Sequence, residues 1–322
     1  MTERYLLTGG AGNLACQLTH VLAADAERIV LFDQAPRPVA NPSTGCVYVR
    51  GDLTQPDALP ALFAAHRPTV VLHLASLLSG TTEQDRPRGW AVNADATFGV
   101  LEAALAGGVR TVFFPSSLAA YGGSLPDPLP EDHPQWPTSL YGVTKAAAER
   151  LGVYYHERHG LDFRYLRLPV VISPHAPAGA ASGYSSRAFV EAAQTGRFVF
   201  PVKPATRVST VYVRDALAGI AALLRAPAAA LTQRVYNIHG VAPAAGEIAA
   251  AIQARLPQAA LRFEPDPALV ALIDSWPAQI IDRSARRDWG WQPTWTLDRL
   301  ADDLLSGDAC DTGRIRPLSA AG

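Results

Sequence analysis

Three residues near the middle of the chain have the types and the spacing of a proton-transfer site. Ser117 ends the apolar run "RTVFFPSS", and 24 residues later the sequence "YGVTK" places Tyr141 and Lys145 four positions apart. In a helix this spacing puts both side chains on one face. A phenol is a poor base at neutral pH, but a neighbouring ammonium favours the phenolate, which can accept a hydroxyl proton.

The lysine of this set is one of only two in the chain, the other being Lys203, although arginine is abundant. A lysine ammonium is a compact donor and is not interchangeable with a guanidinium. The sequence therefore indicates that an ammonium is specifically required at position 145. A tyrosine and a lysine at this spacing can also form an exposed pair on a helix, so the interpretation depends on the rest of the chain.

A glycine-rich turn near the N-terminus predicts a dinucleotide-binding site. The sequence "TGGAGNLACQL" (8–18) follows the apolar run "RYLL", and Gly10, Gly12 and Ala15 match the pattern G-x-G-x-x-G/A. We expect this turn to place backbone N–H groups beside a pyrophosphate at the start of a helix. The residues expected to do so are Gly9, Gly12, Asn13 and Leu14.

A carboxylate at the end of the next apolar run completes this prediction. Asp33 ends "RIVLFD", at the distance where dinucleotide-binding folds place the acid that hydrogen-bonds the adenosine ribose. Its charge favours NAD and repels the additional phosphate of NADP, although nearby Arg37 leaves a minor NADP alternative open. A bound nicotinamide ring, which is positive, would also favour a phenolate at Tyr141.

The elements that must position these residues alternate between strand-like and helical patterns. This alternation predicts an α/β fold of the Rossmann type, a doubly wound parallel sheet with a smaller C-terminal substrate lobe. The uniformly apolar runs are typical of strands buried on both faces. We expect strands over 4–8, 28–33, 46–52, 69–75, 110–117 and 162–169, with helices over 12–24, 56–66, 90–107 and 139–159. In the second half we expect a strand and then a helix over 207–224, strands over 234–240 and 260–265, and a helix over 244–256.

The same pattern predicts how the chain divides into domains. We expect an NAD-binding domain over 1–170, to which the chain returns near 207–226, and a mainly substrate-binding lobe over 171–305. The remainder, 306–322, has little apolar content, and we expect it to be a mobile tail. The tryptophans expected to pack the second lobe together are Trp276, Trp289 and Trp291.

The composition argues against several other classes of protein. With 322 residues, 18% charged residues and a formal net charge of -1, the chain has no basic footprint for nucleic acid. No apolar stretch approaches the roughly 20 residues that cross a bilayer, and the N-terminus lacks a signal-peptide pattern, so we expect a cytoplasmic protein. The three cysteines are far apart, and the pair His156 and His159 lacks accompanying carboxylates, so we expect neither disulfides nor a metal site.

Taken in order along the chain, these motifs resemble the extended short-chain dehydrogenase/reductase family, which includes nucleotide-sugar epimerases and dehydratases. The resemblance covers about residues 4–305 and rests on "TGGAGNLA", "GDL" (51–53), "LHLAS" (72–76), "VNADAT" (92–97), "FPSSLAAYG" and "YGVTK". It implies that Ser117 hydrogen-bonds the substrate oxygen, that Tyr141 exchanges its proton, and that Lys145 lowers the tyrosine pKa and holds the ribose. It also implies further cofactor contacts at Asp52, Leu53, Leu74, Ala75, Ser76, Asn93, Pro169 and Val171.

Within this family, several segments favour the enzymes that act on small hydroxy acids. The stretches 141–173 and 273–305 resemble the short-chain type of L-threonine 3-dehydrogenase, which oxidises the β-hydroxyl of threonine with NAD. The stretches 73–94 and 176–186 are more similar to D-erythronate dehydrogenase, which acts on a sugar acid. We do not see the long basic and aromatic insertion that holds a nucleotide diphosphate in the sugar-nucleotide enzymes.

For a short acid with a secondary hydroxyl, the pocket should offer hydroxyl donors and one cation. The threonine enzymes carry a threonine pair where this chain has Ser182 and Gly183. Each candidate serine can instead be a loop residue bonded to its own backbone, and Trp276 can either pack or close the pocket. The expected substrate contacts are Ser79, Gly80, Thr81, Ser117, Tyr141, Ser182 and Tyr184, with Arg207 or Arg187 paired to the carboxylate.

The sequence thus predicts an NAD-dependent oxidoreductase that oxidises a secondary hydroxyl, with L-threonine as the first candidate substrate and a sugar acid such as D-erythronate as the second. A nucleotide-sugar epimerase or dehydratase that holds NAD tightly is the alternative. A regulatory protein that binds NAD without turnover is a further class, against which the intact catalytic set argues. The resemblance also implies a homodimer in which helices near 90–107 and 139–159 form a four-helix bundle, and the alanine-rich stretch 145–155 suits close packing.

Overall fold

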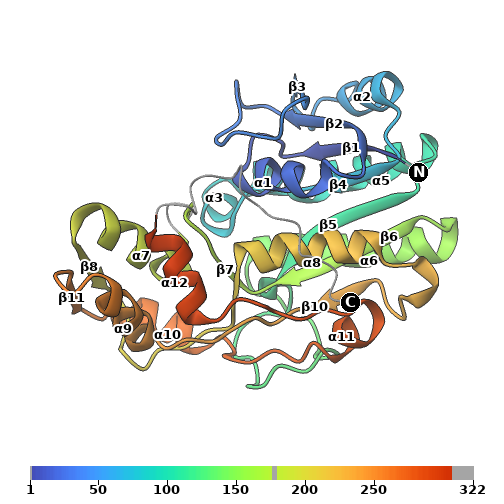
Figure 1. The fold of residues 1–322 in the computed structure, drawn as a ribbon. Helices are drawn as coiled ribbons and strands as arrows, with labels where there is room; N and C mark the ends of the chain where they lie inside the picture. The colour runs from blue at the N-terminus through green and yellow to red at the C-terminus, as the bar shows by residue number, and fades with distance from the viewer. Residues whose placement is uncertain (1, 176–179, 307–322) are drawn as a thin grey trace.

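The centre of the fold is a seven-stranded parallel sheet, seen in the computed structural model of the chain (Figure 1). The structure describes residues 2–175 and 180–306. The strand order is β10-β6-β5-β4-β1-β2-β3, and neighbouring strands run parallel. The strands are β1 (Glu3–Thr8), β2 (Ala26–Asp33), β3 (Val47–Arg50), β4 (Val70–His73), β5 (Thr111–Ser117), β6 (Asp162–Leu168) and β10 (Val235–Asn237).

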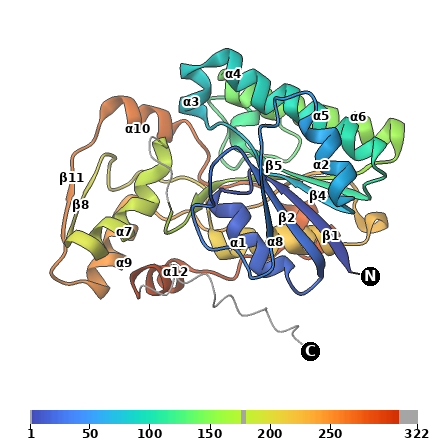
Figure 2. The same ribbon diagram turned by 90° about the horizontal axis from the view of Figure 1, so that it is seen from above.

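Burial on both faces explains why these apolar runs form the sheet. Leu6 and Leu7 are adjacent in β1 and fully buried, yet they belong to two separate cores on opposite faces. Helices α1 (Asn13–Leu22) and α8 (Val213–Arg225) cover one face, and α2 (Ala58–His66), α5 (Ala96–Ala106) and α6 (Leu140–His159) cover the other (Figure 2). The predicted doubly wound, Rossmann-type parallel sheet is therefore confirmed.

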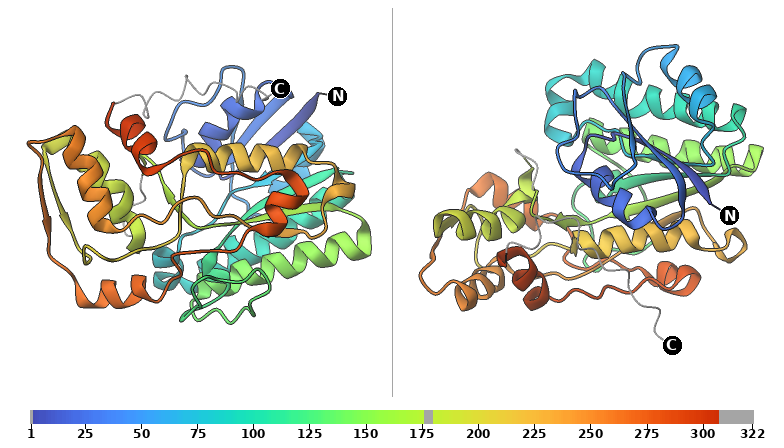
Figure 3. Two further views of the ribbon diagram at one scale, coloured as in Figure 1. Left: turned by 60° about the horizontal axis from the view of Figure 1, so that its bottom comes forward. Right: turned by 45° about the horizontal axis from the view of Figure 1, so that its top comes forward.

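The second half of the chain adds two small parallel sheets and several helices, most of them grouped to one side of the large sheet (Figure 3). Strand β7 (Val170–Ile172) pairs with β9 (Thr210–Tyr212), and β8 (Arg197–Phe200) pairs with β11 (Ala260–Phe263). The helices are α7 (Tyr184–Thr195), α9 (Ala245–Arg255), α10 (Pro267–Asp274), α11 (Arg283–Trp289) and α12 (Leu297–Leu305). Trp289 and Trp291 pack against each other with ring centroids 5.9 Å apart.

Several elements were not expected from the sequence. Helices α7, α10, α11 and α12 and strand β8 lie in segments for which we predicted no element, because short amphipathic pieces become stable only against tertiary neighbours. The predicted helix over 90–107 is instead α4 (Arg86–Trp90), a π-helical turn over Ala91–Asp95 and then α5, and α3 (Ser79–Gln84) precedes them. Such π turns occur at functional sites. The segment 234–240, which was expected within the second lobe, supplies β10 of the large sheet.

Some predictions fall outside the described residues. The predicted mobile tail lies there from residue 307 onward, as does the start of the loop 176–186. Within 2–175 and 180–306, no helix is long and apolar enough to span a membrane, and no cluster of three metal-ligating side chains occurs. The division of the chain into domains near residue 170 stays a prediction.

Candidate active site

The candidate site lies where the carboxyl ends of β1, β4 and β5 meet at one edge of the sheet. These strands are neighbours and run parallel, so the segments that follow them emerge side by side. In open α/β sheets, ligands bind at this edge. The glycine turn follows β1, the segment 74–76 follows β4, and Ser117 ends β5.

The glycine turn is pressed against both neighbouring strands. Gly9 has a φ of +66°, and a Cβ there would lie 2.6 Å from the backbone nitrogen of Ala75. A Cβ on Gly10 would lie 2.7 Å from the backbone nitrogen of Phe32. Glycine is therefore required at both positions, because backbone atoms occupy the space of a side chain.

The first turn of α1 is open to an anionic group. Gly12 is its N-cap, no side chain caps the helix, and no acidic residue lies in the first turn. Its N–H groups and the positive end of the helix dipole thus suit a pyrophosphate. The buried Oδ1 of Asn13 has no hydrogen-bond partner among the described residues, which leaves an acceptor available to a ligand. The turn therefore fits a dinucleotide.

Two carboxylates border the adenosine end of the predicted cofactor site. Asp33 at the end of β2 accepts hydrogen bonds from the backbone N–H groups of Ala11 at 3.1 Å and Ala35 at 2.9 Å, so it is fixed against the glycine turn. Asp52 accepts bonds from the backbone N–H of Thr54 at 2.9 Å and from its hydroxyl at 2.8 Å. The backbone bond from Thr54 is the main reason that the pKa of Asp52 is lowered. These hydrogen bonds hold both carboxylates in place.

Asn93 supports the segment after β4 through its side chain. Its Oδ1 accepts a hydrogen bond from the backbone N–H of Leu77 at 2.8 Å, and its Nδ2 donates to the carbonyl of Leu77 at 3.0 Å. The hydroxyl of Ser76 also donates to Oδ1, at 3.3 Å. Asn93 therefore holds Ser76 and Leu77 in position, and its predicted contact with the cofactor stays a prediction.

The structure brings the three predicted catalytic residues together. Ser139 caps α6 by accepting a bond from the N–H of Gly142 at 3.1 Å, and a Cβ on Gly142 would lie 2.3 Å from the carbonyl oxygen of Ala119. The start of α6 is thus packed tightly on the turn that follows Ser117. Ser117 hydrogen-bonds Tyr141, and the Lys145 ammonium lies 5.4 Å from the centroid of the Tyr141 ring.

Burial dominates the electrostatics of this set. Burial raises the pKa of Tyr141 to about 12, against the hydrogen bond from Ser117, which lowers it. Burial also lowers the pKa of Lys145 to about 7, and Glu149 opposes that effect. The ammonium donates to the carbonyl of Pro115 at 3.0 Å and lies 4.4 Å from the centroid of the Phe114 ring. The chain's own groups thus keep Tyr141 protonated, and further positive charge is needed to form the phenolate.

His73 lies behind the set as a neutral, fully bonded residue. Burial lowers its pKa to about 3. Its Nδ1 is 2.6 Å from the Thr8 hydroxyl and its Nε2 is 3.0 Å from the Thr97 hydroxyl. Because the Thr97 hydroxyl donates to the carbonyl of Asn93, Nε2 must carry the proton and donate to Thr97. His73, at the end of β4, therefore links β1 to α5 and offers no acid or base near neutral pH.

The predicted substrate residues fall into two groups. Ser79, Gly80 and Thr81 are exposed in the first turn of α3, which packs beside the start of α6, where Glu83 accepts a bond from the N–H of Leu140 at 2.7 Å. Helix α3 therefore lies beside the residue that precedes Tyr141, and the substrate contacts of its first turn stay a prediction.

In the second group, Ser182 is half-buried, whereas Tyr184 is 1% exposed and belongs to the hydrophobic core, so packing explains it. Arg207 is exposed and bonded to both carboxylate oxygens of Glu247, at 2.7 and 2.9 Å. Among the described residues Arg187 makes no hydrogen bond or ion pair. Of the two candidate cations, Arg187 is the one whose guanidinium is not engaged within the part of the chain described.

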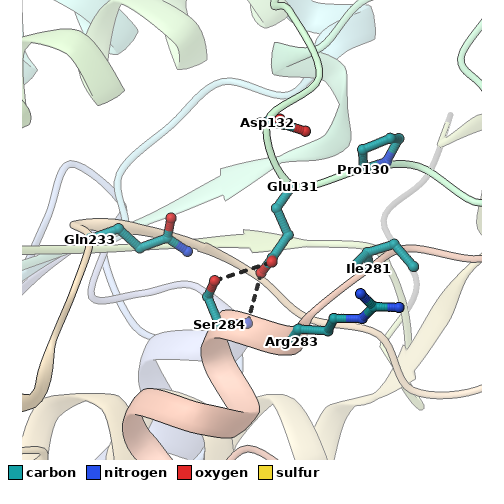
Figure 4. Close-up of a pocket in the computed structure, with 7 residues that line it drawn as sticks. All are labelled: Pro130, Glu131, Asp132, Gln233, Ile281, Arg283 and Ser284. Atoms are coloured by element: carbon teal, nitrogen blue, oxygen red, sulfur yellow. Dashed lines mark hydrogen bonds between the residues drawn. The ribbon is translucent and has the colours of Figure 1, made fainter.

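A separate pocket of about 500 Å³ lies between the segment after β5 and the start of α11 (Figure 4). Its Glu131 is engaged, because Oε1 accepts a bond from the N–H of Ser284 at 3.0 Å and Oε2 accepts one from its hydroxyl at 3.1 Å. None of the predicted catalytic residues lines it. The lining residues are Pro130, Glu131, Asp132, Gln233, Ile281, Arg283 and Ser284.

The fold and this arrangement of residues define an NAD-binding enzyme of the short-chain dehydrogenase/reductase type. The chain belongs to the NAD-dependent epimerase/dehydratase family, whose model matches residues 5–238. It is an NAD-dependent dehydrogenase of this family, and the family prediction and the NAD prediction are both confirmed.

Several proteins that are similar to this chain are named L-threonine dehydrogenases. It is 33% identical over 308 residues to the mitochondrial L-threonine 3-dehydrogenase of Bos taurus, covering 94% of this chain and 82% of that protein. The structure of L-threonine dehydrogenase from Clostridium difficile matches with a TM-score of 0.88 and 29% identity, over 98% of this chain and 99% of that chain. The holo form of a GalE-like L-threonine dehydrogenase from Cupriavidus necator matches with a TM-score of 0.88 and 31% identity. The match covers 94% of this chain and 99% of that chain.

Proposed function

We propose that the enzyme oxidises the secondary hydroxyl of a small hydroxy acid with NAD, and that L-threonine is the first candidate. The observation that carries this proposal is the set of Ser117, Tyr141 and Lys145 beside a dinucleotide turn, in a chain similar over nearly its whole length to L-threonine dehydrogenases. The absence from the sequence of a long basic and aromatic insertion also favours a small substrate.

In this proposal the chain orients the substrate and accepts its hydroxyl proton. Ser117 donates a hydrogen bond to the substrate oxygen, and the Tyr141 Oη accepts the hydroxyl proton as the C–H bond on the same carbon breaks. When bound, NAD supplies the positive charge that favours the phenolate and accepts the hydride pair at nicotinamide C4. The products are a ketone and NADH, with the proton on Tyr141. A protonated Lys145 beside the phenolate would favour it further.

In this proposal, residues near the start of α6 form the substrate pocket. Ser79, Gly80 and Thr81 on α3 provide hydroxyl and backbone donors, and Ser182 provides a further hydroxyl. Arg187 is the better candidate for a substrate carboxylate, since Glu247 already binds Arg207. A sugar acid such as D-erythronate is the second candidate, because Ser182 and Gly183 stand where the threonine enzymes have a threonine pair.

The test is NADH formation by the purified enzyme across L-threonine, D-erythronate, related hydroxy acids and free uronates, with NADP run in parallel. A strong NAD-linked signal with one hydroxy acid is the expected result. No NADH with any of them, together with NAD retained through purification, would instead favour the epimerase, which returns the hydride. Binding of NAD with no turnover of acids or nucleotide sugars would favour a regulatory role.

We also propose a cytoplasmic homodimer in which α5 and α6 pair with those of a second copy. Large apolar side chains are exposed on these helices, among them Phe98 at 47% and Tyr154 at 52%. One structural neighbour is titled a monomeric L-threonine 3-dehydrogenase, so related chains differ in this respect. Light scattering at micromolar concentration should give twice the 34.3 kDa mass of the chain, and a single-chain mass would contradict the dimer.

A further inference from the structure

Glu149 lies on the same face of α6 as the proposed catalytic pair. Tyr141, Lys145 and Glu149 follow one another at intervals of four residues, each about one helical turn. The Glu149 side chain is 0% exposed, so its carboxylate lies in the interior, one helical turn beyond Lys145. A buried carboxylate is costly unless it is paired and hydrogen-bonded.

The Glu149 carboxylate joins the ends of two strands to α6. Its Oε1 accepts bonds from the Ser116 hydroxyl at 2.7 Å and from Nε of Arg167 at 2.9 Å. Its Oε2 accepts bonds from Nη2 of Arg167 at 2.6 Å and from the side-chain amide of Gln135 at 2.8 Å. Ser116 precedes Ser117 at the end of β5. Arg167 is the second-last residue of β6, just before Pro169 and Val171, which are predicted to contact the cofactor.

Arg167 is held on its other side, which makes the cluster rigid. Its Nη1 donates to the Tyr121 hydroxyl at 2.5 Å, and its guanidinium carbon lies 4.4 Å from the centroid of that ring. The Tyr121 hydroxyl in turn donates to Oδ1 of Asn237 in β10 at 2.9 Å. The carboxylate therefore cannot shift without breaking its hydrogen bonds to Ser116 in β5, to Arg167 in β6 and to Gln135.

We propose that Glu149 is a positioning residue for the reaction, which holds Ser117 and Lys145 in register through Ser116 and Arg167 and keeps a negative charge behind the ammonium. This inference rests on the proposed dehydrogenase function. Glu149 acts without an ion pair to Lys145, because the ammonium donates instead to Pro115. Its effect on the charge of Lys145 is therefore exerted through space.

Among the titratable groups around Lys145, Glu149 is the one that raises the lysine pKa. His73 on β4 is neutral, Tyr141 is protonated, and Tyr165 on β6 is a buried phenol whose pKa is raised by burial. Arg167 is positive and therefore opposes protonation of the lysine. Since Glu149 raises the pKa of Lys145 and burial lowers it to about 7, loss of the carboxylate charge should lower it further.

The test uses the fact that the chain has only two lysines. In protein labelled with ¹³C-lysine, the NMR titrations of Lys145 and Lys203 can be followed separately, and Lys203 is an exposed internal reference. Glu149→Gln keeps the size of the side chain and removes its charge. The matched control is Asp162→Asn, which weakens the ion pair with buried Arg164 at the opposite end of β6.

In Glu149→Gln we expect the Lys145 pKa to fall by about one unit or more while Lys203 is unchanged. In Asp162→Asn we expect both lysines to titrate as in the unmodified enzyme. Ser116→Ala, which removes one bond and leaves the charge, should lower kcat several-fold with the Lys145 titration unchanged, and it keeps the test available if Glu149→Gln does not fold.

Two results would overturn the inference: a Lys145 titration in Glu149→Gln that matches that of Asp162→Asn, or an unchanged kcat in Ser116→Ala. The titration needs neither substrate nor NAD. Failure to find any substrate would therefore count against the proposed function and would be distinguished from failure of the Glu149 proposal.

Discussion

Replacement of Tyr141 by phenylalanine tests the proposed base with a minimal change. The substitution removes one hydroxyl from a half-buried ring and leaves the glycine turn, Asp33 and Lys145 in place. Loss of a positioned general base costs roughly 10²- to 10⁴-fold in kcat, which corresponds to about 2.7 to 5.4 kcal/mol of transition-state stabilisation. The lost hydrogen bond to Ser117 should change the free energy of unfolding by only about 1 kcal/mol, since burial of the hydroxyl already opposes it.

The assay compares kcat with the dissociation constant for NAD, measured by quenching of tryptophan fluorescence. We expect NAD affinity to stay within about twofold while kcat falls, because the ring still fills its space. The matched control is Tyr155→Phe on the same helix, where the hydroxyl donates to Glu102. That variant should lose stability and keep its kcat. Undiminished turnover in Tyr141→Phe would refute the assignment of the base.

Three further predictions concern the turn, the cofactor and a buried histidine. Gly10→Ala should lower the free energy of unfolding by about 1 to 3 kcal/mol in urea titration, whereas Gly123→Ala, with open space at its Cβ, should not. Asp33→Ala should reduce the preference for NAD over NADP by roughly tenfold or more in kcat/KM, and an unchanged preference would contradict its ribose role. The His73 pKa of about 3 lies below the unfolded value near 6.5, so its contribution to stability is complete above pH 6.5 and declines toward pH 3. Between pH 7 and pH 5 this loss is roughly 2 kcal/mol and should be absent from His73→Gln, so equal losses in both proteins would show that other groups cause it.

The sequence by itself indicated the parallel sheet, the glycine turn and the three candidate catalytic residues. The strands are continuous apolar runs, the glycines are needed where backbone atoms leave no room for a Cβ, and a four-residue spacing on a helix can only mean one shared face. Each of these signals is local, or repeats at a fixed period, and so can be recognised in one chain. Glu149 belonged to the same series, four residues after Lys145, and that spacing was the signal available for finding it.

The tertiary structure alone decided which polar side chains are free and which are already engaged. Arg207 and Arg187 are equivalent candidates in the sequence, but folding brings Glu247 onto Arg207 from 40 residues away. Tyr184 is buried in a helix, α7, that packs against β8, α9 and α12, all from distant parts of the chain. In the same way, the bonds from Ser116 and Arg167 to Glu149 join residues 33 and 18 positions apart. Hydrogen bonds and burial depend on such distant partners, whereas periodicity does not, and that is why the fold was predictable from the sequence and the details of the pocket were not.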